Sequence, residues 1–247
     1  MKKVCRITEA EVIAEFLKGE FYNREYDQDR NRFELLVQEP DLNDDAENEV
    51  RRALLFRRRA SMWRELPETT QWWEVGLESG DLERLNVFPR AQWRSIAQGN
   101  FGALHVAELV SRSFNPAAKL GDLSAKIYAL RSLMGLEGPR STILLIGRDE
   151  NQPVTVLEGN HRLVAALLLP REMMLRRLRI VCGFCPEMDR CCWYKTTLPS
   201  LARYLKNRIQ HLWTRKIDPG QLLEQVGRRQ ALEKYARSAG LSSVETE

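Results

Sequence analysis

The sequence has no long hydrophobic run. Its longest apolar stretch covers seven positions, Leu163–Leu169, whereas a membrane-spanning helix needs about 20 residues. The basic N-terminal residues are followed by Glu9, Glu11 and Glu15, where a signal peptide requires an apolar segment. We therefore expect a soluble, cytoplasmic protein that has no membrane partner.

Glycine and proline are not enriched, and no internal repeat or low-complexity segment is present, so collagen-like and repeat architectures are excluded. The 247 residues are 43% hydrophobic and 29% charged, a composition that can bury a core and does not indicate disorder. This length suits one large domain or two small ones.

Cysteine is scarce, and the five cysteines do not suggest a disulfide framework in a cytosolic chain. Four of them lie within eleven residues, namely Cys182, Cys185, Cys191 and Cys192. Four thiolates can bind zinc, but zinc sites usually pair two separated C-x-x-C knuckles, and the adjacent Cys191 and Cys192 depart from that spacing. We favour packing of these residues in and beside a strand, and no metal site is predicted.

Positive charge is concentrated toward the C-terminal end. Residues 171–237 contain 15 Lys/Arg and six Asp/Glu, an excess that favours an anionic partner such as a nucleotide, a phosphorylated small molecule or a nucleic acid. Aromatic residues that could stack on bases lie within this segment: Trp193, Tyr194, Tyr204, Trp213 and Tyr235. The alternative is a solvated basic helix face with these aromatic residues packed in the core.

Hydrophobic periodicity and capping signals predict a series of helices. The expected helical ranges are 8–18, 46–65, 102–113, 122–134, 198–213 and 219–238. Thr8 is the predicted N-cap of the first helix, because Glu11 follows it at the capping-box spacing.

The pattern changes after residue 140. Two β-rich runs at 141–146 and 154–157 are joined by a short polar stretch and predict a hairpin. Alternation predicts a third strand over 175–184, with Arg177 and Arg179 on its polar face, and a shorter β-rich run occupies 72–77. We expect an α+β fold in three parts: a mainly helical region over 1–115, a small mixed sheet with helices over 116–197, and basic helices over 198–247.

The segment that carries chemistry is a strand that ends in Glu158-Gly159-Asn160-His161-Arg162 and continues into an apolar helix. The first backbone N–H groups of a helix lack intrahelical acceptors, so they bind anions and phosphates. Gly159 allows a positive φ or a close backbone approach, and Asn160 is a good N-cap residue.

The charged residues of this turn fit the same interpretation. His161 and Arg162 add donors, and the Arg162 guanidinium can contact two phosphate oxygens at once. Glu158 could ligate Mg²⁺ or take a proton from a hydroxyl group. In the alternative interpretation Asn160 only caps the helix, and His161 and Arg162 pair with Glu158 or with neighbouring carboxylates.

The stretch Leu157–Ala166 resembles the signature of the ParB/sulfiredoxin-like superfamily, and the resemblance covers residues from about 120 to 195. In that superfamily a strand, a Gly-x-His-Arg or Gly-x-x-Arg turn and an alanine-rich helix form a phosphate- or nucleotide-binding corner. The resemblance implies a small mixed sheet with helices and anion binding at Gly159, Asn160, His161 and Arg162. Asn160 stands where sulfiredoxins have their catalytic cysteine, so sulfiredoxin chemistry is not expected.

Members of this superfamily include kinases, NTPases and nucleases. We expect an enzyme that transfers a phosphoryl group or hydrolyses a nucleotide, using a nucleoside triphosphate or diphosphate with Mg²⁺. Glu158, His161 and Arg162 are the predicted catalytic residues. Further cations for the nucleotide are predicted at Arg148, Arg177 and Arg179. The alternatives are a nucleic-acid-binding protein or nuclease that acts through residues 171–237, and a non-catalytic interaction subunit.

Overall fold

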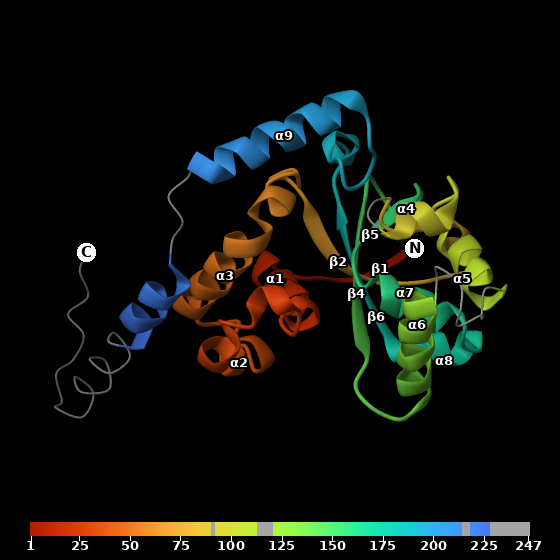
Figure 1. Ribbon diagram of the computed structural model, residues 1–247, viewed down its shortest axis with the longest axis horizontal. Helices are drawn as coiled ribbons and strands as arrows, with labels where there is room; N and C mark the ends of the chain where they lie inside the picture. Colours follow the sequence, from red (N-terminus) through yellow and green to blue (C-terminus); the bar gives the residue numbers. More distant parts are fainter. Residues whose placement is uncertain (90–91, 113–120, 214–217, 228–247) are drawn as a thin grey trace.

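The computed structural model describes residues 1–89, 92–112, 121–213 and 218–227. In this part of the chain six strands form one mixed sheet in the order β1-β2-β6-β4-β5-β3. The strands are β1 (Lys2–Arg6), β2 (Gln71–Gly76), β3 (Leu85–Asn86), β4 (Ser141–Gly147), β5 (Val154–Glu158) and β6 (Leu178–Phe184). Figure 1 shows the sheet nearly edge-on at the centre of the molecule, with helices on both sides.

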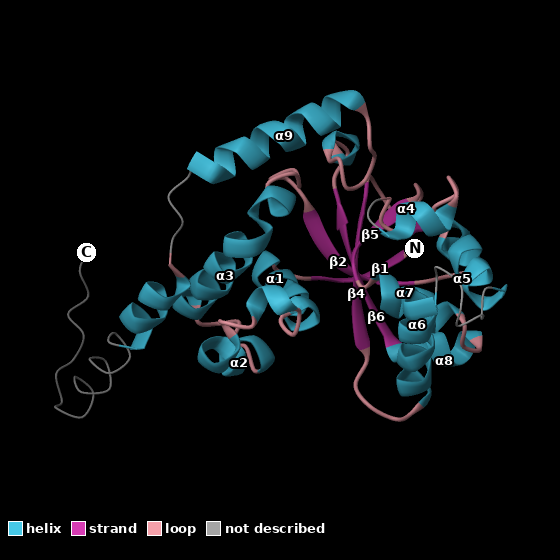
Figure 2. Cartoon of the chain, viewed as in Figure 1, coloured by secondary structure: helices cyan, strands magenta, loops and turns pink. Residues whose placement is uncertain are grey.

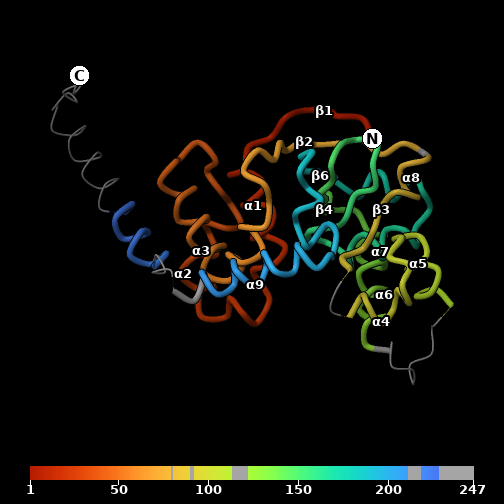
Figure 3. The backbone as a smooth tube through the Cα atoms, turned by 90° about the horizontal axis from the view of Figure 1, so that it is seen from above, coloured from red at the N-terminus to blue at the C-terminus, as the bar shows by residue number. Residues whose placement is uncertain are grey.

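The helices form two groups, one against each face of the sheet, as Figures 2 and 3 show from two directions. The first group is α1 (Glu9–Glu20), α2 (Arg30–Gln38) and α3 (Asp45–Trp63). The second group is α4 (Gln92–Ala97), α5 (Ala103–Arg112), α6 (Gly121–Gly135), α7 (Asn160–Leu167) and α8 (Arg171–Arg177). Helix α9 (Leu198–Trp213) crosses above the first group, and three short 3₁₀ helices occupy Arg24–Tyr26, Ser79–Arg84 and Met188–Arg190.

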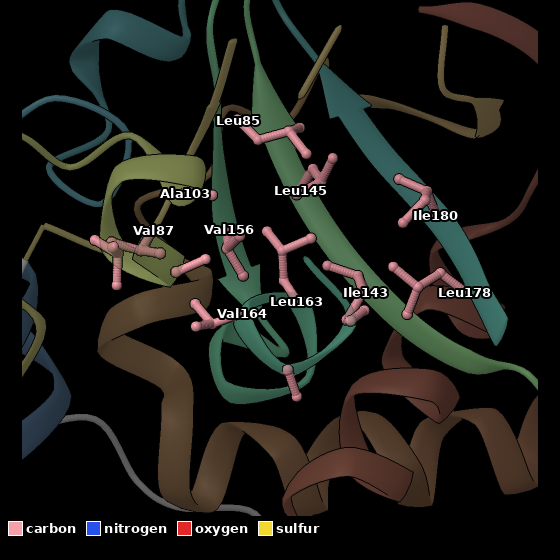
Figure 4. Close-up of a cluster of buried hydrophobic side chains, with 14 of the residues drawn as sticks. Leu85, Val87, Ala103, Ile143, Leu145, Val156, Leu163, Val164, Leu178 and Ile180 are labelled. Atoms are coloured by element: carbon pink, nitrogen blue, oxygen red, sulfur yellow. The ribbon is translucent and has the colours of Figure 1, made fainter. Parts of the chain in front are cut away.

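The helices bury both faces of the sheet, and this explains why β4 is apolar along most of its length. Ile143 and Leu145 point into the core beneath α4 to α8, which Figure 4 shows in close-up. Leu144 and Ile146 point into the core beneath α1 to α3. Strand β4 therefore lies at the centre of a layered structure in which each face has its own hydrophobic core.

Most of the predicted elements are confirmed. The expected helices correspond to α1, α3, α5, α6 and α9, and the hairpin is the antiparallel pair β4–β5. Thr8 caps α1, since its Oγ1 accepts a hydrogen bond of 3.2 Å from the backbone N–H of Glu11. The helix predicted over 219–238 is helical from 219 to 227; its remaining residues, Tyr235 among them, lie outside the described part of the chain.

The sheet is larger than predicted, because residues 1–115 contribute β1, β2 and β3. Of these three, only β2 was expected, from the β-rich run at 72–77. The description of this region as helical is therefore incomplete, although helices with a mixed sheet are confirmed as the fold class. Strand β1 escaped prediction because it lies at the sheet edge and all its side chains are exposed, so no apolar alternation marks it. Its Lys2, Lys3 and Arg6 are typical of edges that resist pairing with another chain.

The strand predicted over 175–184 begins later, at Leu178, because residues 171–177 form α8. Arg177 therefore ends a helix and does not share a strand face with Arg179. The ParB/sulfiredoxin-like character of the fold stays a prediction. Among the described helices, none is long and apolar enough to cross a membrane.

Gly183 allows β6 to pack against Trp72, which pairs with it across the sheet. A β-carbon at Gly183 would lie 2.7 Å from the Trp72 ring and 2.9 Å from Cγ2 of Thr70. We expect Gly183→Ala to lower the free energy of unfolding by about 1–3 kcal/mol, as overpacking does in other cores. Urea unfolding measures this. Gly135→Ala is the control, since a β-carbon there meets no atom within 4 Å; equal stability of the two variants would contradict the expectation.

Candidate functional site

The turn between β5 and α7 depends on Gly159. This residue is the N-cap of α7 and has φ +97°, a left-handed conformation that other residues rarely adopt. A β-carbon there would lie 2.7 Å from Cδ1 of Ile143 in the neighbouring strand. The turn therefore takes the positive φ expected from the sequence and brings the backbone close to β4.

Asn160 does not cap the helix, so the prediction that it is the N-cap residue is wrong. It is the first residue of α7, and its Oδ1 accepts a 2.7 Å hydrogen bond from the backbone N–H of Phe88. The amide side chain thus ties the loop after β3 to the start of α7. Without the position of Phe88, which is 72 residues away, the sequence cannot distinguish this role from capping.

His161 faces the first residues of α4. Its Nε2 lies 2.6 Å from Nε2 of Gln92, and its ring centroid lies 5.0 Å from that of Trp93. Burial, together with the positive charges of Lys126 and Arg162, lowers the pKa of His161 to about 4. The imidazole is therefore neutral near pH 7 and accepts a hydrogen bond from the Gln92 amide.

Glu158 and Arg162 form an ion pair across the first turn of α7. The side chains are only 11% and 23% exposed, respectively. Helix α1 covers the pair at Gly19, where a β-carbon would lie 2.8 Å from both Nη2 of Arg162 and Oε2 of Glu158. The alternative interpretation, in which Arg162 pairs with Glu158, is therefore correct on this point: one guanidinium nitrogen of Arg162 binds the carboxylate of Glu158.

The ion pair does not keep Glu158 fully ionised. Burial raises the pKa of Glu158 to about 7, and the charge of Glu20 also raises it, while Arg162 and the Gly159 N–H lower it. A carboxyl group with this pKa can both accept and release a proton at neutral pH. Glu158 is therefore a suitable general acid or base.

A cavity of about 360 Å³ opens beside this turn. Five aromatic residues from different parts of the chain contribute to its lining: Phe16, Phe88, Trp93, Trp193 and Tyr204. The rings of Phe88 and Trp193 are stacked with their centroids 5.0 Å apart, and Tyr204 meets Trp193 edge-on at 5.2 Å. Glu158, Gly159, Asn160 and His161 lie on the cavity wall beside these rings.

Helices α1 and α3 supply charged groups to the cavity that the sequence interpretation did not include. Arg58 and Arg59 of α3 and Glu20 of α1 line it. Arg59 lies at a kink in α3, where its φ and ψ are −125° and 15°, and it pairs with Glu20 at 2.6 Å and with Glu25. The run Arg57-Arg58-Arg59 was the available signal in the sequence, but nothing in it connected α3 with residue 158.

The three further cations predicted for the nucleotide lie elsewhere. Arg148 pairs with Asp189 at 3.2 Å. Arg177 donates to the backbone carbonyl groups of Met134 and Gly138. Arg179 pairs with Glu11 and Glu74. None of the three lines the cavity beside Glu158, so the structure separates them from Gly159, Asn160, His161 and Arg162.

The clustered cysteines are buried on both sides of the sheet. Cys182 lies in the core beneath α4 to α8, whereas Cys185 and Cys191 lie in the core beneath α1 to α3. Burial raises the pKa of Cys182 and raises that of Cys191 to about 12, so both are thiols at neutral pH. Within the described ranges, no three His, Cys, Asp or Glu side chains are grouped to hold a metal ion.

Three comparisons with known proteins were made. No family model, no curated protein and no solved structure matches this chain. We therefore infer a function from the geometry of the cavity and from the motif at its wall.

Replacing Glu158 with Gln tests the raised pKa. Below about pH 4.5 the carboxyl is protonated in both the folded and the unfolded state, whereas above pH 7 the folded state must bury its charge. The free energy of unfolding of the wild type, relative to Glu158→Gln, is expected to fall as pH rises from 5 to 8. At about 1.4 kcal/mol per pKa unit, the fall is on the order of 3 kcal/mol.

Urea unfolding of both proteins at several pH values measures this difference. His161 is present in both, so its own titration cancels when the two curves are subtracted. Parallel curves across the range would show that Glu158 titrates normally.

Proposed function

We propose that this protein binds a nucleotide in the cavity beside the Glu158–Arg162 turn and transfers its phosphoryl group to a hydroxyl group or to water. The observation that carries the proposal is the placement of a carboxyl group with a near-neutral pKa, two arginines and an aromatic wall around one cavity. The resemblance of Leu157–Ala166 to the ParB/sulfiredoxin-like turn supports the same assignment.

The two sides of the cavity suit the two parts of a nucleotide. Phe88, Trp93, Trp193 and Tyr204 offer ring faces and edges on which a base can pack. The first N–H groups of α7 lack intrahelical acceptors and attract phosphate oxygens, and Arg58 and Arg59 add positive charge nearby. The volume of about 360 Å³ lies within the usual range for small-molecule sites.

Glu158 would act as the base that takes a proton from the attacking hydroxyl group or water. Arg162 holds the carboxylate in place and favours its ionised form. His161 is neutral at pH 7, so its contribution is hydrogen bonding and not charge. Phosphoryl transfer then depends mainly on orientation and on the positive groups around the phosphate.

Mg²⁺ is the cofactor that this chemistry implies. Nucleotide-bound Mg²⁺ usually takes one or two carboxylates from the protein, with phosphate oxygens and water as its other ligands. The cavity offers two carboxylates, Glu20 and Glu158, each paired with an arginine. Glu20 would hold the ion, which supplies charge neutralisation at the phosphates when bound, and Glu158 would remain the base.

A second candidate function is nucleic-acid binding through residues 171–237. Helix α9 favours it, because Arg203, Lys206 and Arg208 are all exposed there. Tyr204 and Trp193, however, line the cavity; the side chain of Trp213 and the whole of Tyr235 lie outside the described part of the structure. A DNA or RNA affinity that falls steeply with added salt would favour this function.

Nucleotide binding should raise the melting temperature. Ligand at 100 times its Kd stabilises a protein by about 2.7 kcal/mol, which corresponds to roughly 5–10 °C for a domain of this size. A thermal-shift screen of nucleoside mono-, di- and triphosphates, with and without Mg²⁺, measures this. We expect Arg58→Gln to reduce the shift and Arg148→Gln, which removes an exposed cation outside the cavity, to keep it.

Release of inorganic phosphate from the nucleotide, or transfer of the phosphoryl group to an acceptor, tests the chemical step. Loss of a general base typically costs 10²- to 10⁴-fold in rate, so Glu158→Gln should bind nucleotide and turn it over slowly. A chain that shows no nucleotide shift under any condition contradicts the proposal. An Arg162→Ala variant that folds and functions normally would favour a non-catalytic interaction subunit.

A further inference from the structure

A second, larger cavity of about 830 Å³ lies between α3, the β1–α1 connection and the segment that joins α3 to β2. One wall is the β1–α1 connection with Arg6, Ile7 and Thr8, and another is the segment that leads from the end of α3 into β2. None of its lining residues belongs to the cavity beside Glu158. It is therefore a separate candidate site.

Three arginines line this cavity, and two of them have no acidic partner. Arg52 pairs with Glu9 at 2.7 Å, whereas Arg6 and Arg64 form no ion pair with any described residue. Glu9 also accepts a 2.8 Å hydrogen bond from Nε1 of Trp63. Its carboxylate is thus already satisfied and does not neutralise the other two guanidinium groups.

Aromatic contacts hold two of the guanidinium groups in place. The guanidinium carbons of Arg52 and Arg64 lie 5.1 Å and 5.8 Å from the ring centroid of Phe56. Contacts at these distances are favourable cation–π interactions. They restrict the side chains before a ligand arrives and so reduce the entropy lost on binding.

Part of the cavity wall is apolar. Trp63 and Trp72 contribute little surface to it, since they are only 4% and 5% exposed. The rings of Trp63 and Trp72 are stacked, with centroids 6.1 Å apart and an interplanar angle of 15°. Ile7 and Leu66 extend this apolar surface. A planar apolar group can pack against the partly exposed side chains of Phe56 and Leu66 while an attached anion reaches the arginines.

We propose that this cavity is a binding site for a small organic anion in which a carboxylate or phosphate is joined to a planar apolar group. Arg6 and Arg64 bind the anionic group, and the partly exposed side chains of Phe56 and Leu66, next to Trp63 and Trp72, contact the ring. Glu68, an exposed acid on the cavity wall, opposes binding by like-charge repulsion. This site is independent of the proposed nucleotide site.

The indole N–H signals of a ¹⁵N-labelled full chain can locate a ligand, because each cavity has its own tryptophans. Trp63 and Trp72 line this cavity, whereas Trp93 and Trp193 line the other. The probes are phenyl phosphate, benzoate and the neutral benzyl alcohol, with Trp→Phe variants to assign the signals. We expect saturable shifts of the Trp63 and Trp72 signals with at least one anionic probe. Whichever of phenyl phosphate and benzoate binds more tightly identifies the anionic group that the site prefers.

Matched variants test the charge requirement. Arg64→Gln and, separately, the exposed Arg6→Gln should weaken binding about tenfold or more, and Glu68→Gln should tighten it. Arg112→Gln removes an exposed pair with Glu108 on α5 and should leave binding unchanged. Unperturbed signals of the remaining tryptophans show that each variant is folded.

Several outcomes would overturn the proposal. These are no saturable shift at millimolar probe, equal binding of benzyl alcohol, shifts confined to Trp93 and Trp193, or full affinity in both arginine variants. Shifts confined to Trp93 and Trp193 would place the anion in the nucleotide cavity and leave the proposed function intact.

Discussion

The site depends on the ion pair between Glu158 and Arg162. Helix α1 packs against this pair through Gly19, which has no side chain to keep them apart. The helix layer on one side of the sheet therefore comes against the turn that starts α7. The same closeness brings Glu20 near Glu158, whose side chain is only 11% exposed. Burial and this second carboxylate raise the pKa of Glu158 to about 7 even though an arginine is its partner. A structural contact between layers therefore also produces a titratable group at neutral pH.

The cavity beside this pair belongs to no single segment of the chain. Its charged groups come from α1, α3 and the β5–α7 turn. Its aromatic groups come from α1, from the loop after β3, from α4, from the segment after β6 and from α9. The division into parts at residues 115 and 197 stays a prediction, but the cavity combines residues from all three parts. A substitution in α3 can consequently affect the chemistry of residue 158 although about 100 residues separate them in the sequence.

Residues of α3 line both cavities, and the arginines of the two cavities have different partners. Beside Glu158, the arginines are largely occupied by carboxylates, with Arg59 bound to Glu20 and Glu25. In the larger cavity, Arg64 rests on the Phe56 ring and has no ion pair among the described residues. Arg58 and Arg59 would share their charge between their carboxylate partners and a bound phosphate, whereas Arg64, held by an aromatic ring, has no such partner among the described residues. These different environments are the physical reason for assigning the cavities different ligands.

The sequence by itself determined the features that depend on neighbours in the chain: the Thr8 cap, the β4–β5 hairpin, the amphipathic helices and the positive φ of Gly159. Each follows from side chains within a few residues of one another. Tertiary structure alone decided that Asn160 binds Phe88 instead of capping α7, and that Arg148, Arg177 and Arg179 lie away from the turn. It also decided that Arg58, Arg59 and the aromatic wall lie beside Glu158. These outcomes depend on which distant segments pack together, and local patterns of hydrophobicity and charge do not contain that information.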